Sequence, residues 1–224
     1  MRIKVGLVNV RVVNLINVRA VRPIKIKIVC LLQERECIIL DAMKRHKENG
    51  GVQKKGCGAL LSLAMNDDNQ KTIAKEGGIK MILNAMKEHA KDAEVQTNGC
   101  GALHNLACNA DIRKTIADEG GIKVILNAMK EHGSISGVQD RGCGALQNLA
   151  ANDDNNKAIA KQGGIKVILN AMKEHAKDVK VQENGCGALG NLAVNDDDEK
   201  TIAKEGGIKV ILGAMAMILD AMAT

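Results

Sequence analysis

With 224 residues and 46% hydrophobic content, the chain is long enough to form one sizeable folded domain. Phe, Tyr and Trp are absent, so a core must be built from aliphatic side chains, Met, Ala and Cys. The net charge of +6 comes from residues 1–37, which hold eight basic and two acidic side chains, because residues 38–224 hold 24 of each sign. This balance argues against a broad nucleic-acid-binding surface.

The cysteine count and the hydropathy pattern both bear on the cellular compartment. Seven cysteines, an odd number in a chain without a secretory leader, indicate reduced thiols. No apolar run reaches the roughly 18 residues that a membrane span requires, because basic residues interrupt the apolar N-terminal segment. We therefore expect a cytoplasmic protein, with the nucleus as a second possibility, and no stable membrane insertion.

The first element in chain order is a basic leader, residues 1–33. The alternation in Ile24-Lys25-Ile26-Lys27-Ile28 is typical of a strand, whereas the acid-free composition is typical of a transit peptide. Three interpretations stay open: a poorly ordered leader, a segment that contacts a membrane or organelle, and a degenerate helical repeat. The boundary with the repeat domain, residues 34–224, is placed at residue 33.

The dominant feature of residues 34–224 is an internal repeat of 43 residues. Gly-Gly pairs, single His residues and single Cys residues each recur at this interval, and residues 77–119 match residues 163–205 at 33 of 43 positions. About four copies are present. The first is degenerate, with Glu34 and Arg35 in the place of Gly-Gly, and the last is cut short within its second helix.

Each copy is expected to form three helices, as residues 109–151 illustrate. A first helix begins near Asn109, a capping residue, and ends at Gly120, where glycine accepts a left-handed conformation. A second helix follows, with apolar residues at helical spacing up to Lys130. After a loop at residues 133–137, a third helix runs from about Val138 to Ala150, and its small residues permit close approach of neighbouring helices.

One such unit cannot bury its own apolar face, so the copies are expected to stack into a solenoid. The Gly-Gly after the first helix and the phrase Ala102-Leu103-His104-Asn105-Leu106-Ala107, with close copies at 145–150 and 188–193, resemble armadillo repeats. The phrasing is similar to protist and algal armadillo proteins and to the armadillo region of leucine-rich repeat kinases. The resemblance implies an all-α fold, a right-handed superhelix of 43-residue three-helix repeats.

The resemblance also implies a binding groove. In armadillo proteins that bind extended peptides, Asn side chains of the third helices hydrogen-bond the peptide backbone, since an amide both donates and accepts. The matching positions are Asn105, Asn148 and Asn191, with Ser62 in the first copy. The alternative is that these Asn residues only cap or fix local backbone.

Other polar positions could add to the recognition of a partner. The residue before each Asn differs between copies and includes His104 and Gln147, while Gln96, Gln139 and Gln182 could form a second polar row nearby. Neutral drift on a solvated face explains the differences equally well. Importin-like armadillo proteins place Trp four residues before the Asn, where this chain has glycine, which argues against recognition of nuclear localisation signals.

No catalytic residue, metal site or cofactor is expected. The periodic His and Cys lie eleven residues apart across a loop, without the spacing of zinc ligands, and a uniform distribution does not build one asymmetric active site. Cys57, Cys100, Cys143 and Cys186 are interpreted as packing residues. The His residues are assigned to helix C-termini and the Asp runs to helix starts.

The sequence therefore predicts a protein-interaction scaffold or adaptor that binds an extended protein segment in an armadillo groove. The alternative is a regulatory armadillo region of a larger multidomain protein, such as a kinase, present here as a fragment. Because bare apolar ends favour association, self-association through the ends of the solenoid is a further possibility.

Overall fold

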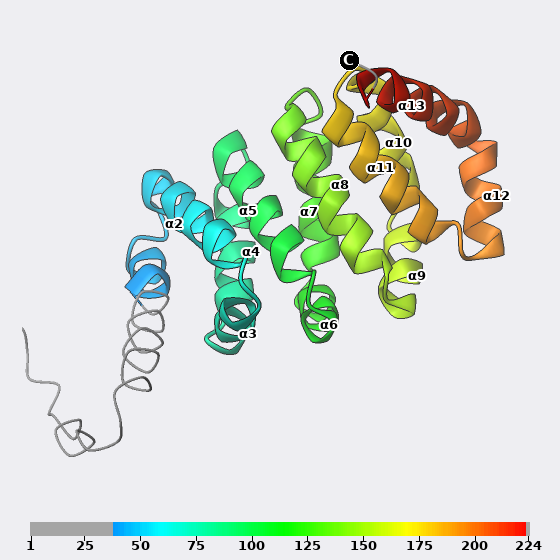
Figure 1. Ribbon diagram of the computed structural model, residues 1–224. Coiled ribbons are helices and arrows are strands. Elements are labelled where there is room, and N and C mark those ends of the chain that lie inside the picture. Colours follow the sequence, from blue (N-terminus) through cyan, green and yellow to red (C-terminus); the bar gives the residue numbers. More distant parts are fainter. Residues whose placement is uncertain (1–37, 223–224) are drawn as a thin grey trace, which may run out of the picture.

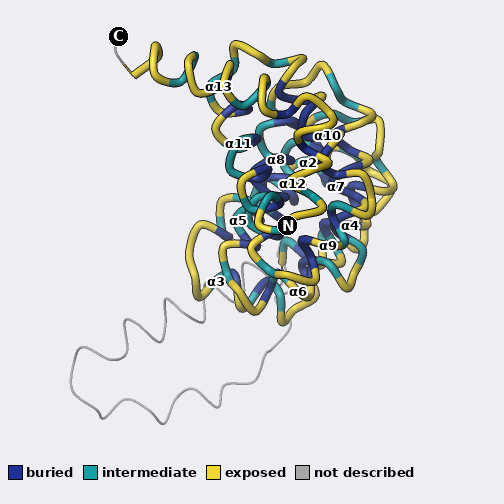
Figure 2. The backbone as a smooth tube through the Cα atoms, turned by 90° about the vertical axis from the view of Figure 1, so that its right-hand side faces the viewer, coloured by how far each residue is buried: buried dark blue, intermediate teal, exposed yellow. Residues whose placement is uncertain are grey.

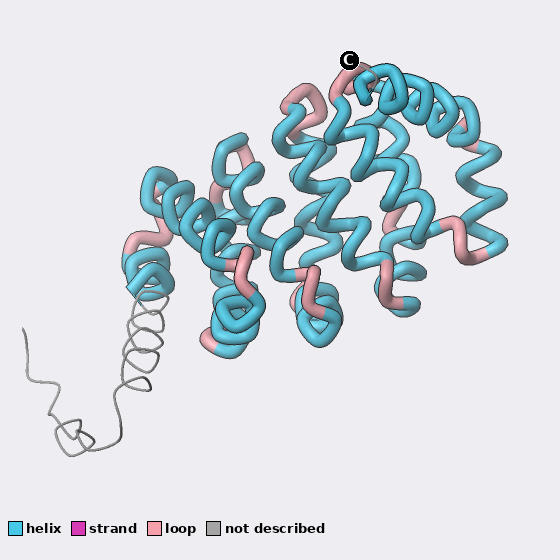
Figure 3. Tube along the Cα trace, viewed as in Figure 1, coloured by secondary structure: helices cyan, strands magenta, loops and turns pink. Residues whose placement is uncertain are grey.

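The computed structural model of the protein describes residues 38–222, and within this range all regular structure is helical (Figures 1 and 3). The first helices of the copies are α3 (Asp67–Lys75), α6 (Ala110–Asp118), α9 (Asp153–Lys161) and α12 (Asp196–Lys204). The second helices are residues 38–45, α4 (Gly78–Glu88), α7 (Gly121–Glu131), α10 (Gly164–Glu174) and α13 (Gly207–Met222). The third helices are α2 (Gly50–Leu63), α5 (Ala93–Leu106), α8 (Ser136–Ala150) and α11 (Val179–Leu192). The leader, residues 1–33, lies outside the described residues.

The helix boundaries follow from the capping residues that the sequence supplies. Asn109 accepts the backbone N–H of Asp111 and starts α6, and Gly120 takes a left-handed φ of 82° where α6 gives way to α7. The third helix α8 begins at Ser136, inside the expected loop, so the predicted start near Val138 was wrong by about one half-turn. Its N-cap, Ile135, has no side chain that can cap, so the sequence carries no signal there.

Within each copy, the second helix packs its apolar stripe against the third helix of the same copy. Met86, Met129 and Met172 are each no more than 2% exposed. Each lies over a glycine of the third helix: a Cβ atom on Gly142 would be 2.6 Å from Cγ of Met129. Glycine at this position is therefore required for the close helix packing, as its small size suggested.

The copies stack so that the third helices α2, α5, α8 and α11 lie side by side on one face, with the second helices behind them (Figure 1). The third helices pack closely, whereas open crevices remain between successive second helices, such as the one that Met129, Lys166 and Val167 line between α7 and α10. The stack therefore bends with the third helices on its inner side. Buried residues form a continuous core through the stack (Figure 2).

Successive copies are also joined by a histidine at the end of each second helix. The ring Nε2 of His89, His132 and His175 lies 2.7 Å from the backbone oxygen of the residue 42 positions earlier, in the loop of the preceding copy. The sequence placed these residues correctly at helix C-termini, where they are the C-caps. Their side chains, however, bridge copies rather than cap their own helix.

The Asp runs lie in the first turns of α3, α9 and α12, as expected for charges that favour a helix start. None of the helices between residues 38 and 222 is both long enough and apolar enough to cross a membrane.

Candidate partner-binding face

The candidate site is the inner face of the stack, which we call the third-helix face. It consists of the exposed and half-buried residues of α2, α5, α8 and α11. The Asn row of this face comprises Asn105, Asn148 and Asn191, which are half-buried and recur once per copy, with the exposed Ser62 in the equivalent place. The structure thus aligns four of the expected site residues along one side of neighbouring helices.

Each Asn of the row is held by the preceding copy. Its side-chain Nδ2 donates to the backbone oxygen of the residue 44 positions earlier, at 3.0 Å from Asn105 to Leu61, 3.0 Å from Asn148 to His104 and 2.9 Å from Asn191 to Gln147. These oxygens belong to the last turns of α2, α5 and α8. In a continuing helix, the backbone N–H four residues later would bond such an oxygen. Here that N–H bonds the carbonyl of the following residue instead: the N–H of Cys108, for example, bonds the oxygen of Asn105. The Asn side chain therefore satisfies a carbonyl that the backbone donors of the preceding copy leave free. At His104 the Cys108 thiol is a second donor to this oxygen, at 3.7 Å.

The carbonyl oxygen of each Asn side chain is not used in this way. Among residues 38–222, no donor hydrogen-bonds Oδ1 of Asn105, Asn148 or Asn191. Ser62 differs, because its hydroxyl donates to the backbone oxygen of Gly58 on its own helix, at 3.1 Å. The row therefore combines fixed orientation with a free acceptor on each of the three Asn side chains.

The glutamines that the sequence suggested as a second polar row do not reach the surface. Gln96, Gln139 and Gln182 are only 1–2% exposed. The Nε2 of Gln139 donates to the backbone oxygens of Met129 at 3.0 Å and His132 at 2.8 Å, and the other two make the equivalent pairs of bonds. These side chains close the end of the second helix within their own copy, and we do not include them in the candidate site.

The residues before Asn105 and Asn148 pack onto the next third helix. A Cβ atom on Gly144 would lie 2.7 Å from Cε1 of His104, and one on Gly187 would clash with the side-chain amide of Gln147. The space beside each glycine that lies four residues before an Asn of the row is therefore occupied by a side chain of the preceding copy. This explains in steric terms why the chain has no room there for the Trp of importin-like proteins.

Of the residues that precede the Asn row, His104 has a buried polar atom without a hydrogen-bond partner. Its ring Nδ1 is buried and has no hydrogen-bond partner among the described residues. Burial and, to a lesser extent, the Arg141 guanidinium lower the pKa of His104, while Asp140 acts in the opposite direction. The imidazole is thereby held in its neutral form at neutral pH.

Two neighbours of His104, Asp140 and Arg141, form a pair that was not among the predicted site residues. Asp140 and Arg141 are half-buried on α8, with 3.6 Å between the carboxylate and the guanidinium. Arg141 was not identified as a site residue from the sequence. The signal was available, since Arg141 takes the place of Asn98 and Asn184 in the neighbouring copies, and Asn184 donates to Asp140.

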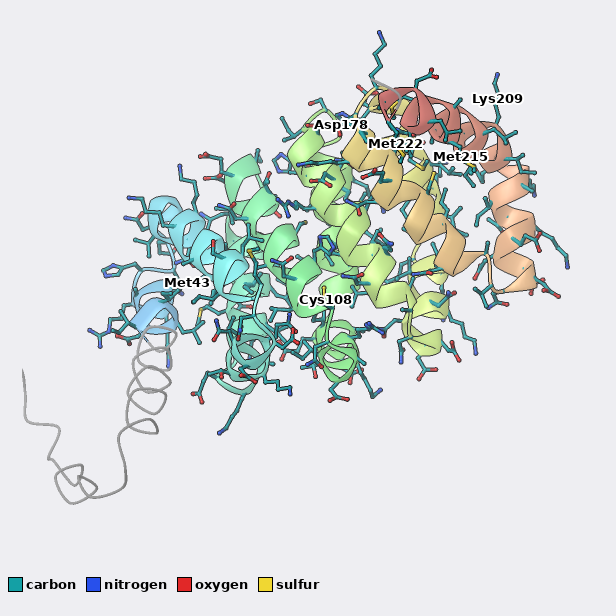
Figure 4. All side chains as sticks on the ribbon, viewed as in Figure 1. Met43, Cys108, Asp178, Lys209, Met215 and Met222 are labelled. Atoms are coloured by element: carbon teal, nitrogen blue, oxygen red, sulfur yellow. The ribbon has the colours of Figure 1, made fainter. Side chains whose placement is uncertain are left out.

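Within residues 38–222, no three His, Cys, Asp or Glu side chains are grouped so that they could hold a metal ion. Burial raises the pKa of the Cys57 and Cys100 thiols to about 12 and raises that of Cys143 further, so these groups are poor nucleophiles. Cys57, Cys100 and Cys143 are fully buried and Cys186 is half-buried, in line with their interpretation as packing residues. Cys108, at the end of α5, is exposed (Figure 4).

The sequence comparison now decides the family. The family described as LRRK2 ARM repeat matches residues 3–206. The chain belongs to the LRRK2 ARM repeat family. The match includes most of the basic leader, whose boundary at residue 33 stays a prediction. No curated protein matches the sequence.

A solved structure of an engineered protein supports the same architecture. It has a TM-score of 0.68 and 27% sequence identity to the ARM repeat chain, and the alignment covers 80% of this chain and 69% of the engineered one. The predicted all-α armadillo solenoid is therefore confirmed, and the family is one of repeat scaffolds.

Proposed function

We propose that this ARM repeat chain is a scaffold or adaptor whose third-helix face binds an extended segment of a partner protein. The observation that supports the proposal is the Asn row. Three copies present an amide that is fixed through Nδ2 and has a free Oδ1, so a passing peptide backbone could donate to each in turn.

The residues beside the Asn row would provide the specificity. Leu61, His104, Gln147 and Gly190 occupy equivalent positions but offer an apolar side chain, an imidazole, an amide and no side chain, respectively. The face lacks Phe, Tyr and Trp, so each copy contributes modest affinity and binding depends on several copies acting together. A partner segment would therefore span at least two neighbouring third helices.

The test compares two triple variants for binding to displayed libraries of extended peptides. The variant of the third-helix face carries Asn105→Ala, Asn148→Ala and Asn191→Ala. The matched control carries Asn84→Ala, Asn127→Ala and Asn170→Ala, which change exposed Asn residues of the second helices that make no side-chain hydrogen bonds within residues 38–222. We expect peptides selected on the parent protein to bind the control and to lose affinity for the first variant.

A steric variant separates loss of binding from loss of stability, because the Asn row also joins the copies. Gly190 is exposed on α11, and nothing lies within 4 Å of a Cβ atom placed on it. Gly190→Trp should therefore fold normally while obstructing the third-helix face. If the selected peptides bind Gly190→Trp and the Asn-row variant as tightly as they bind the parent, the proposed groove is wrong.

A second candidate function is that of a regulatory region within a larger protein, such as a kinase. The description of the family, which names the ARM repeat of a kinase, favours it. Sequencing the transcript through the codon of Thr224 tests this candidate: continuous coding sequence into a further domain supports it, and a stop codon there contradicts it.

A further inference from the structure

One position of the third-helix face is occupied differently in the central copy. Asn98 of α5 and Asn184 of α11 hold this position, and each donates through Nδ2 to the backbone oxygen of the residue 44 positions earlier, at 3.1 and 3.3 Å. In α8 the position is Arg141, which makes no such bond within residues 38–222. In the first copy it is the exposed Lys55. The junction between α5 and α8 therefore lacks one hydrogen bond that the junctions on either side have.

The guanidinium of Arg141 is half-buried without a hydrogen bond. The side chain is 37% exposed, and in the described part of the chain its ion-pair partner is Asp140, with 3.6 Å between Nε and the nearer carboxylate oxygen. This distance is longer than a hydrogen bond. The other carboxylate oxygen of Asp140 accepts Nδ2 of Asn184, at 2.7 Å. Because a guanidinium has five N–H donors, and unpaired donors are unfavourable where water is partly excluded, Arg141 is suited to an acceptor that the chain does not supply.

The surroundings of Arg141 hold its side chain on the third-helix face, between α5 and α8. A Cβ atom placed on Gly101 would lie 3.4 Å from Cδ of Arg141 and 3.0 Å from Cδ1 of Leu61, so both side chains flank the same glycine. Burial and the Arg141 guanidinium lower the pKa of His104, which lies about one turn further along α5. The guanidinium is thus bordered by an apolar side chain and a neutral imidazole. Such neighbours reduce its hydration and strengthen its attraction to an anion.

The local charge favours a carboxylate over a phosphate group. A guanidinium pairs with the two oxygens of a carboxylate through two parallel N–H donors. A phosphate group carries up to twice the charge, and proteins usually bind it with several basic side chains. Here one guanidinium lies beside the Asp140 carboxylate, which would repel a dianion more strongly than a monoanion. The site therefore suits a singly charged carboxylate.

The site also lies within reach of a segment bound along the Asn row. Arg141 precedes Asn148 by seven residues, which is two helical turns or about 10 Å along the axis of α8. Its Cδ lies beside Gly101, which precedes Asn105 by only four residues, or about 6 Å along α5. The side chain of Arg141 thus covers part of the distance to the Asn row. A long acidic side chain is needed to cover the rest, which favours glutamate over aspartate.

On the basis of the function proposed above, we propose that Arg141 is a specificity residue of the third-helix face, whose guanidinium binds the carboxylate of a glutamate in the partner segment. The backbone of the same segment would donate to Oδ1 of Asn105 and Asn148. Because the copies are nearly identical, the Asn row alone cannot fix which residue of the segment lies on which copy. The single arginine at this position in the stack fixes that register.

Peptides selected on the parent protein from libraries of extended sequences test this inference. We expect them to share a glutamate, and we expect replacement of that glutamate by glutamine to weaken binding at least about tenfold. Arg141→Asn should weaken binding of the original peptide by a similar factor and should make the protein indifferent to the replacement. The matched control is Lys123→Asn, which removes a positive charge from an exposed position of the second helix α7. It should leave the affinities for both peptides unchanged.

Arg141→Asn is also designed to keep the fold intact, because asparagine is the residue of the two neighbouring copies. Its side chain should donate to the backbone oxygen of Thr97, 44 positions earlier, as Asn98 and Asn184 do at their junctions. The melting temperature of the variant should therefore not fall below that of the parent. A loss of peptide affinity then reports on the guanidinium and not on unfolding.

The possible outcomes separate this inference from the proposed function. Peptides that bind the third-helix face without a shared glutamate, or that bind Arg141→Asn as tightly as the parent, would overturn the role of Arg141 and leave the scaffold function standing. If no peptide binds the third-helix face, both are wrong. Phosphoserine in place of the glutamate should weaken binding. Tighter binding of the phosphopeptide that Arg141→Asn abolishes would contradict the assignment to a carboxylate.

Discussion

At the scale of single residues, the side chain of an Asn in the Asn row fixes the preceding copy through Nδ2 and keeps Oδ1 available, so the two roles that the sequence presented as alternatives are compatible. The family resemblance implied peptide binding, while the competing interpretation was that the Asn fixes backbone. The Nδ2 of Asn148 bonds the preceding copy, but its Oδ1 remains free. The sequence could not separate these interpretations, because the bond joins residues 44 positions apart whose alignment depends on how the copies stack.

Asn148→Ala should therefore destabilise the fold even without a partner. The substitution removes the amide donor of the last-turn oxygen of His104 and leaves it only the weaker Cys108 thiol, which costs roughly 1 kcal/mol in the free energy of unfolding. Asn127→Ala, at an exposed position of α7, should change the free energy of unfolding by much less. Urea unfolding followed by circular dichroism measures both. Equal stability of the two variants would show that the bond between copies contributes nothing.

The pKa of His104 predicts a pH dependence of stability. Burial lowers this pKa below the ordinary value of 6.5, so the unfolded chain binds a proton more readily than the folded one. Stability should therefore fall as the pH decreases through the interval between the ordinary and the lowered pKa. His104→Gln places at this position the residue that the next copy already has, Gln147, and should remove part of the fall. Melting temperatures at about pH 7.5 and pH 5 provide the comparison; an identical fall in both proteins would contradict it.

At the scale of the helix, glycine has opposite effects at two places that look alike in the sequence. Both Gly142 and Gly190 lie inside third helices, where glycine is unfavourable by about 1 kcal/mol relative to alanine. The Met129 side chain occupies the space beside Gly142, while the space beside Gly190 is empty. Glycine is therefore required only where a side chain of the second helix packs against the backbone of the third helix.

Alanine substitutions at these two positions should therefore shift stability in opposite directions. Gly142→Ala would force Met129 away from its place and should lower the free energy of unfolding by ~1 kcal/mol despite the better helix propensity. Gly190→Ala should raise it by about 0.5–1 kcal/mol. Thermal or urea unfolding of both variants is the measurement. A stabilising Gly142→Ala would mean that the contact with Met129 is loose.

The elements were predictable from the sequence to the extent that local signals mark them. The capping Asn109 and the left-handed Gly120 fixed the ends of α6, and the apolar stripe identified α7. The start of α8 was misplaced because Ile135 gives no capping signal. The roles of Gln139 and His132 were also missed, since each depends on a backbone oxygen that only the folded structure brings near.

At the scale of the whole molecule, each copy contacts only its neighbours, so stability is a sum of local contributions and is lowest where neighbours are fewest. The interior helix α7 buries seven residues along its length, among them Ile125 and Met129. In contrast, α12 buries only Ile202, and α13 buries only Gly207 and Ala214. The C-terminal copy is therefore expected to open more easily than the centre of the stack.

Hydrogen exchange tests this gradient. Backbone amides of α12 and α13 should exchange much faster than those of α7, because α12 and α13 bury far fewer residues and their local opening breaks fewer contacts. Mass spectrometry of the exchanged protein, read helix by helix, is the measurement. Uniform exchange along the described helices would contradict the prediction and show that the solenoid opens as one unit.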